Sequence, residues 1–151
     1  MLLRCVGSNY LKEVHKFIYF NIMFINDELL DEVEAQAQES PRLRMNFDLR
    51  NSPEDQSQRM LNAMEPGTVL PIHRHTTTNE VVIILRGRMD EMFYDDAGNE
   101  THRYHLDPSK GNYALNIPRG MWHTVEVFEP TVIFEAKDGP YAPLSPDDIL
   151  S

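Results

Sequence analysis

The sequence predicts an all-β sandwich or barrel that follows a short N-terminal helical segment. From Arg59 onward, short apolar or alternating runs are separated by turn signals about every eight to twelve residues, with no helical pattern between them. Asp95-Asp96-Ala97-Gly98 has the composition of a hairpin connection, with glycine where a positive φ is needed. We therefore expect strands near 59–65, 68–75, 80–86, 88–94, 100–106, 113–117, 122–128 and 131–137.

The helical segment is expected within residues 25–58, ahead of a barrel over 59–138. Asn26 can cap a helix whose first turn holds Asp27 and Glu28, two acidic residues that suit the positive end of the helix. Ser40-Pro41 ends this helix, and Ser52-Pro53 resembles a second short helical start. One apolar stripe would face the barrel: Leu29, Leu30, Val33 and Ala37.

The strand expected over 80–86 contains a run, 81–85, that is apolar on both faces. One face can fill the barrel, and the other must be covered by a second sheet, by the N-terminal helix or by another subunit. Residues 1–24 have no clear pattern and are either an N-terminal extension or an ordinary element packed on the barrel. Residues 25–151 then form a single domain whose tail, from Pro140, is extended.

Composition narrows the classes of partner and the compartment. The chain has 151 residues, with 14 basic and 24 acidic side chains and a formal charge of −10, and its basic residues form no cluster. Nucleic acid and anionic membranes both require concentrated positive charge, so we expect neither as a partner. Cys5 is the only cysteine, and no apolar run approaches the length of a membrane span. We expect a cytoplasmic protein.

Two histidines and a glutamate between two glycines suggest a metal site. His73 and His75 differ by two positions, so on a strand they would share one face. Glu80 follows at an odd spacing, and the polar stretch 76–79 can turn the chain so that Glu80 opens the next strand and faces back. His123, after the Pro118-Arg-Gly120 turn, can supply a fourth ligand. Three imidazoles and a carboxylate suit Zn, Fe, Ni, Mn or Cu, and ligand type alone does not choose among them.

The same residues carry a family resemblance. Gly67-x5-His73-x-His75-x4-Glu80-x6-Gly87 resembles the first cupin motif, and Pro118-x-Gly120-x-x-His123 resembles part of the second. Val127 stands where that second motif commonly has asparagine. The resemblance implies a double-stranded β-helix, the cupin jelly-roll barrel, with His73, His75, Glu80 and His123 as ligands of one divalent metal ion. The alternative is a cupin that has lost metal binding.

A narrower resemblance extends over most of residues 23–143. It rests on Leu29-Leu-Asp-Glu, Ser40-Pro-Arg-Leu-Arg-Met-Asn46, His73-Arg-His75, Trp122-His123-Thr124 and Glu135-Ala-Lys-Asp-Gly-Pro-Tyr141. These segments look like the WbuC-type cupin-fold metalloproteins, a family associated with polysaccharide and O-antigen gene clusters. The resemblance implies a link to polysaccharide biosynthesis and names no reaction.

Other polar side chains are weighed as possible substrate contacts. Arg42, Arg44 and Asn46 would share one face of an extended segment, where two guanidiniums could clamp a carboxylate or phosphate or could form ordinary surface ion pairs. Glu135, Lys137 and Tyr141 are further candidates, with an acid–base role open for the first two. We interpret His102 and His105 as surface residues and Trp122 as a packing residue.

Taken together, the sequence predicts metal-assisted chemistry, isomerase- or epimerase-like, on a small sugar or sugar derivative. Two alternatives stay open, a metal-dependent dioxygenase and a non-enzymatic metal-dependent sugar-binding or sensor module. We expect a homodimer, because the outer faces of cupin sheets often pair.

Overall fold

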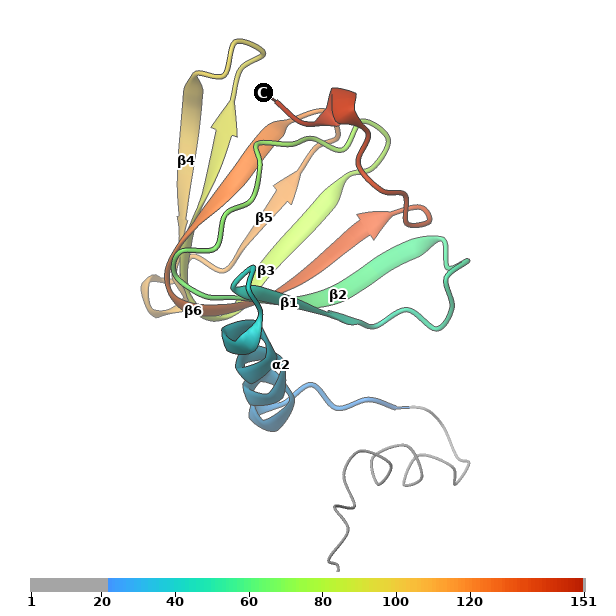
Figure 1. Cartoon of the computed structure of the whole chain (residues 1–151), viewed down its shortest axis with the longest axis vertical. Coiled ribbons are helices and arrows are strands. Elements are labelled where there is room, and N and C mark those ends of the chain that lie inside the picture. The colour runs from blue at the N-terminus through green and yellow to red at the C-terminus, as the bar shows by residue number, and fades with distance from the viewer. Residues whose placement is uncertain (1–21, 151) are drawn as a thin grey trace, which may run out of the picture.

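The computed structural model describes residues 22–150 and has the predicted all-β architecture with a short N-terminal helix (Figure 1). Most of the segment that we expected to be an N-terminal extension, with Cys5, lies outside these residues. No helix in the described range is long and apolar enough to cross a membrane. The elements, in chain order, are α2 (Asp27–Glu39), β1 (Arg44–Asp48), β2 (Ser57–Met64), β3 (Glu80–Tyr94), β4 (Glu100–Leu106), η2 (Pro108–Lys110), β5 (Ala114–Ile117), β6 (Trp122–Asp138) and η3 (Pro146–Asp148).

The strands form one antiparallel sheet in the order β1-β2-β6-β3-β4, with β5 paired to β3. The long strands β3 and β6 pair over nearly their whole length, and their register shifts between Ile84 and Met89. Gly87 lies in this stretch at φ +87°, and a Cβ there would lie 2.3 Å from the carbonyl oxygen of Pro130. We expected separate strands at 80–86 and 88–94, and again at 122–128 and 131–137. Both expectations were wrong, because the pairing changes register while each strand continues, as β3 and as β6.

The curled sheet encloses one core and carries a second on its outer face. Alternate residues of β3, such as Val82 and Ile84, point inward. The inner core joins residues from both halves of the sheet: Met64, Val82, Ile84, Met89, Phe93, Leu106, Ile117, Val127 and Ile133. The outer core lies between the sheet and α2, which is drawn below the sheet in Figure 1. Its buried residues come from α2, β2 and β6: Leu30, Val33, Ala37, Leu61, Ala63 and Val132.

Helix α2 begins and ends where its capping residues predict. The side chain of Asn26 accepts a hydrogen bond from the backbone N–H of Leu29 at 3.2 Å, and Ser40 leaves the helical conformation just before Pro41. The apolar face of the helix packs on β1, β2 and β6, and β3 meets the helix through Arg86, which pairs with Asp27, Asp31 and Glu34. Val81 and Leu85, on the outer face of β3, therefore stay 37% and 40% exposed.

Three local predictions differ from the structure. Residues 44–48 form strand β1, which was not among the expected strands although residues 42–46 were expected to be extended. The strand forms because Met45 and Phe47 alternate toward the outer core while β1 pairs with β2. The segment at Ser52-Pro53 makes a turn rather than a helix. Residues 68–75 do not form a continuous strand. Pro71 has no backbone N–H to donate to a neighbouring strand, and within this stretch only His73 forms an isolated β-bridge.

Candidate metal centre

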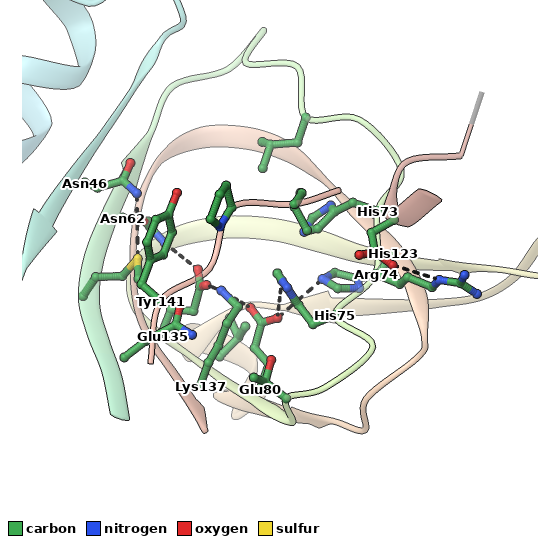
Figure 2. Close-up of a pocket in the computed structure, with 18 of the residues that line it drawn as sticks. Asn46, Asn62, His73, Arg74, His75, Glu80, His123, Glu135, Lys137 and Tyr141 are labelled. Carbon is green, nitrogen blue, oxygen red and sulfur yellow. Dashed lines mark hydrogen bonds and ion pairs between the residues drawn. The ribbon is translucent and has the colours of Figure 1, made fainter. Parts of the chain in front are cut away.

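The four predicted metal ligands come from three segments that meet at one end of the barrel (Figure 2). His73 and His75 lie in the irregular loop before β3, Glu80 is the first residue of β3, and His123 is the second residue of β6. His73 and His123 are bridged through their backbones, with N–H to O distances of 3.0 and 2.8 Å. This pair of hydrogen bonds fixes the loop against β6, so a strand is not needed to position the histidines.

The three imidazoles converge, and Glu80 lies beside two of them. One nitrogen from each of His73, His75 and His123 lies within 4.8 Å of the other two. Oε2 of Glu80 lies 3.5 Å from Nε2 of His75 and 3.6 Å from Nε2 of His123. The odd spacing from His75 to Glu80 is accommodated as expected, because the chain turns over residues 76–79 and Glu80 opens a new strand.

The donor atoms fit a cation bound by imidazole nitrogens. Nδ1 of His73 lies 3.0 Å from the carbonyl oxygen of Pro71, and Nδ1 of His123 lies 2.9 Å from that of Met121. A carbonyl can only accept, so both Nδ1 atoms carry hydrogen, and in the neutral form of each ring Nε2 presents a lone pair. Nε2 of His75 and Oε2 of Glu80 are buried without a hydrogen-bond partner among the described residues. Unpaired buried acceptors are costly, and a divalent transition metal would satisfy both.

Electrostatics favour the metal-binding protonation states of three of the four groups. Burial, with the neighbouring His123, lowers the pKa of His73 to about 4. Burial, with the charge of Lys137, likewise lowers the pKa of His75 to about 4. Burial would raise the pKa of Glu80, but its contacts with His123 and Lys137 lower it to about 2. Metal ligands must be neutral imidazoles and ionised carboxylates, which these groups are near neutral pH.

The pKa of His123 shifts in the other direction. Burial works to lower it, but the contact with the Glu80 carboxylate raises it above the usual value. A metal ion binds the neutral ring, so metal binding to His123 would release a proton from any protonated form.

An acid–base network borders the metal centre. Glu135 and Lys137 point inward from β6, and Nζ of Lys137 contacts Glu135 while lying 3.6 Å from Oε1 of Glu80. The other carboxylate oxygen of Glu135 accepts from Nδ2 of Asn62, on β2. Strand pairing sets Lys137 between Gln58 on β2 and Glu80 on β3. Burial lowers the pKa of Lys137 below its usual value.

A cavity of about 570 Å³ opens beside these groups and is lined by all four candidate ligands. Arg42, Arg44 and Asn46 all line it, but only Arg44 and Asn46 share a face of strand β1, because Leu43 has a φ of +55° and Arg42 lies in the turn before the strand. Glu135, Lys137 and Tyr141 line it as well. Asn46 turns its amide toward Sδ of Met60 at 3.7 Å, and the ring of Tyr141 remains 58% exposed. The structure thus places every candidate substrate residue on one cavity.

Sequence analysis missed Glu91, which lines the cavity from β3 and is only 2% exposed. Burial raises its pKa to about 8. The available signal was its alternation with Met89 and Phe93, two inward-facing core residues, which places a carboxyl group on the inner face. Gln58 and Asn62 were also missed, and their alternation with Leu61 and Ala63 on β2 carried the same information.

Arg74, in the loop that carries His73 and His75, contacts both the start of β6 and the C-terminal segment. Its guanidinium lies 4.3 Å from the ring centroid of Trp122, and its Nε is 3.4 Å from Oδ1 of Asp148. Its backbone N–H donates to the carbonyl oxygen of Asp148 at 3.0 Å. The C-terminal segment, red in Figure 1, consequently runs beside the loop that carries His73 and His75.

The other aromatic and imidazole side chains have structural contacts. Trp122 is buried and donates from Nε1 to Asp96 at 2.9 Å, as a packing residue would. His102 is exposed and stacks on Tyr104, and His105 contacts Asp90 on the face opposite the cavity. None of these side chains lines the cavity.

Comparison with solved structures shows the same fold in other proteins. The capsular polysaccharide assembling protein CapF from Staphylococcus aureus aligns with a TM-score of 0.59 and 23% identity, over 72% of this chain and 31% of CapF. A cupin superfamily protein from Desulfitobacterium hafniense DCB-2 aligns with a TM-score of 0.51 and 17% identity, over 63% of this chain and 76% of that protein. KdgF from a Halomonas species aligns with a TM-score of 0.53 and 14% identity, over 68% of this chain and 83% of KdgF. The chain spans about a third of CapF, and at these identities the likeness establishes the cupin fold alone.

A search of curated proteins finds no significant sequence match. A family-level comparison does find one, over residues 25–106, which include α2, β1 to β4 and three of the four candidate ligands. With this match and its cupin fold, the chain belongs to the family described as "Domain of unknown function (DUF6016)".

Proposed function

We propose that this protein is a metal-dependent cupin that carries out isomerase- or epimerase-like chemistry on a small sugar or sugar derivative. The observation that carries the proposal is the convergence of three imidazoles and Glu80 on the wall of a cavity whose neighbouring wall holds Glu135 and Lys137. The working unit would be the single domain 25–151.

His73, His75, Glu80 and His123 would hold one divalent transition metal. A bound metal would supply Lewis acidity that polarises a carbonyl or hydroxyl oxygen of the substrate. The protein's part is to fix the ligands before binding, through the backbone bridge between His73 and His123 and the carbonyls that orient both rings. Zinc with four protein ligands has little room for substrate, so we favour a metal of higher coordination number.

Glu135 and Lys137 would move the protons. Isomerisation or epimerisation requires removal of a proton from a carbon next to a carbonyl and its return at another position or face. The Glu135 carboxylate can accept such a proton at Oε1, the atom that contacts Nζ of Lys137. The Lys137 ammonium can return a proton from Nζ, and Asn62 holds the second oxygen of Glu135 in place.

The cavity suits a sugar in size and chemistry. About 570 Å³ is within the range of small-molecule pockets, and its amides and carboxylate can donate to and accept from vicinal hydroxyls. Tyr141 offers a ring face at the cavity rim. Similarity in sequence to WbuC-type proteins, and in fold to a capsular polysaccharide assembling protein, supports a substrate from polysaccharide biosynthesis.

Solvent exchange into sugars tests this reaction. Tag-free protein, loaded in turn with Fe²⁺, Mn²⁺, Ni²⁺ and Zn²⁺, is incubated in D₂O with a panel of aldoses, ketoses and uronic acids, and proton NMR follows exchange next to the carbonyl. We expect deuterium incorporation with at least one metal, lost in Glu135→Gln with metal content unchanged. Glu129→Gln, at an exposed residue without an ion pair in the described range, is the matched control.

Three results would replace the proposal. Oxygen consumption with an oxidised product would indicate a dioxygenase. Tight, metal-dependent sugar binding without exchange would indicate a binding module. Unchanged exchange in Glu135→Gln would remove the acid–base assignment.

A further inference from the structure

The mouth of the cavity carries two positive charges without a counter-ion. Arg42 and Arg44 both line the cavity, and neither has a carboxylate within 4.0 Å in residues 22–150. The ordinary surface ion pairs that the sequence left open are therefore not formed by the described residues. Arg74, the third arginine of the lining, is paired with Asp148.

Two neighbouring arginines without a carboxylate partner stand out in a cavity of this acidic chain. The formal charge is −10, and Arg86 and Arg103 on the sheet each contact three carboxylates, whereas Arg88 on β3 has none and lies over the ring of Phe128 outside the cavity. Burial, together with the like charge of the nearby Arg42, lowers the pKa of Arg44. The two guanidiniums repel each other at a place where the protein supplies no anion to offset them.

The backbone holds this arrangement against its local preference. Leu43, between the two arginines, has a φ of +55°, a region that branched side chains rarely adopt. Two hydrogen bonds of 2.9 Å maintain it, from its own N–H to Ser40 and from the N–H of Glu65 to its carbonyl oxygen. Nη1 of Arg44 donates to the carbonyl oxygen of Val69 at 2.7 Å, and its other guanidinium N–H groups have no partner among residues 22–150.

We propose that Arg42 and Arg44 form an oxyanion subsite, and that the small molecule bound in the cavity carries a carboxylate or phosphate group. Guanidiniums bind both groups through paired N–H donors. The proposal rests on the proposed function only in assigning the anionic group to the substrate of the metal centre. It narrows the ligand class from sugars in general to acidic or phosphorylated sugars.

Anion binding by metal-free protein isolates this subsite from the metal chemistry. After chelator treatment and dialysis, inorganic phosphate is titrated by calorimetry and by NMR. Glucuronate, glucose 6-phosphate and glucose follow as a carboxylate, a phosphate and a neutral probe. We expect phosphate and both charged sugars to bind, and glucose to bind at least tenfold more weakly than either.

The variant Arg42→Gln/Arg44→Gln should weaken phosphate binding at least tenfold. The control Arg88→Gln/Lys110→Gln removes the same charge from residues outside the cavity and should change binding less than twofold. Tighter binding of glucose 6-phosphate than of glucuronate would indicate a phosphate ligand, and the reverse order would indicate a carboxylate ligand. Equal binding by the arginine variant and the wild type, or equal loss in both variants, would overturn the subsite. Because no metal is present, neither result depends on the proposed reaction.

Discussion

Glu91 should make the metal-free protein less stable as the pH rises from acid to neutral. Its carboxyl group is 2% exposed and has a pKa of about 8 in the fold, against 4.5 for an ordinary glutamate. Between these two values the unfolded chain is ionised while the native state keeps the proton. The native state then binds more protons, so the free energy of unfolding falls with rising pH in this window.

The size of this effect follows from the two pKa values. Neutral pH lies 2.5 units above the ordinary pKa of 4.5, and each unit corresponds to about 1.4 kcal/mol, so protonating Glu91 on folding costs about 3 kcal/mol at pH 7. Below pH 4.5 both states are protonated and the cost vanishes. Above pH 8 both are ionised and the cost no longer grows. Set against a typical domain stability of about 5–15 kcal/mol, this is a large term.

Glu91→Gln removes the titration while keeping a neutral polar group of similar shape. Urea unfolding of both proteins in EDTA, from pH 4 to 7.5, should give equal stabilities near pH 4 and a variant more stable by about 3 kcal/mol at pH 7. Glu129→Gln should show no pH-dependent difference from the wild type. A Glu91→Gln difference below about 1 kcal/mol, or one independent of pH, would refute the assignment of Glu91 as a buried neutral acid.

Three further changes test other parts of the structure. His75→Ala should lower metal affinity at least tenfold and leave the fold intact, because the core is apolar; stoichiometric metal in that variant would remove His75 from the ligand set. Arg74→Met should also weaken metal binding, about threefold to tenfold by chelator competition, since it loses the contacts to Trp122 and Asp148; unchanged affinity would show that these contacts do not position the loop. Gly87→Ala should destabilise the fold by about 3 kcal/mol or more in urea, because its Cβ would lie 2.3 Å from a backbone oxygen; near-wild-type stability would mean that the bend relaxes easily.

The sequence predicted those features that depend on local pattern. Alternation placed Glu135 and Lys137 on one face, and the turn before Glu80 reconciled an odd spacing with a shared site. The capping residue Asn26 marked the start of α2. In each case the deciding interactions are formed by neighbouring residues, which a single sequence displays.

Features that depend on tertiary contact were missed. Residues 44–48 form a strand because β2 offers them a partner, and the histidine loop is held by a bridge from His73 to His123. Glu91 is a cavity residue only because the sheet curls around it. The continuity of β3 through Gly87 depends on its pairing with β6, which no local window contains.

X-ray absorption on the metal-loaded, tag-free protein tests the central claim most directly. Imidazole rings give characteristic multiple scattering from their outer atoms, so the spectrum counts histidine ligands around the metal. We predict one metal ion per chain, bound by three imidazoles and by oxygen, with the imidazole signal reduced in His75→Ala. Protein that retains no metal after loading, or a bound metal surrounded by oxygen alone, would contradict the account.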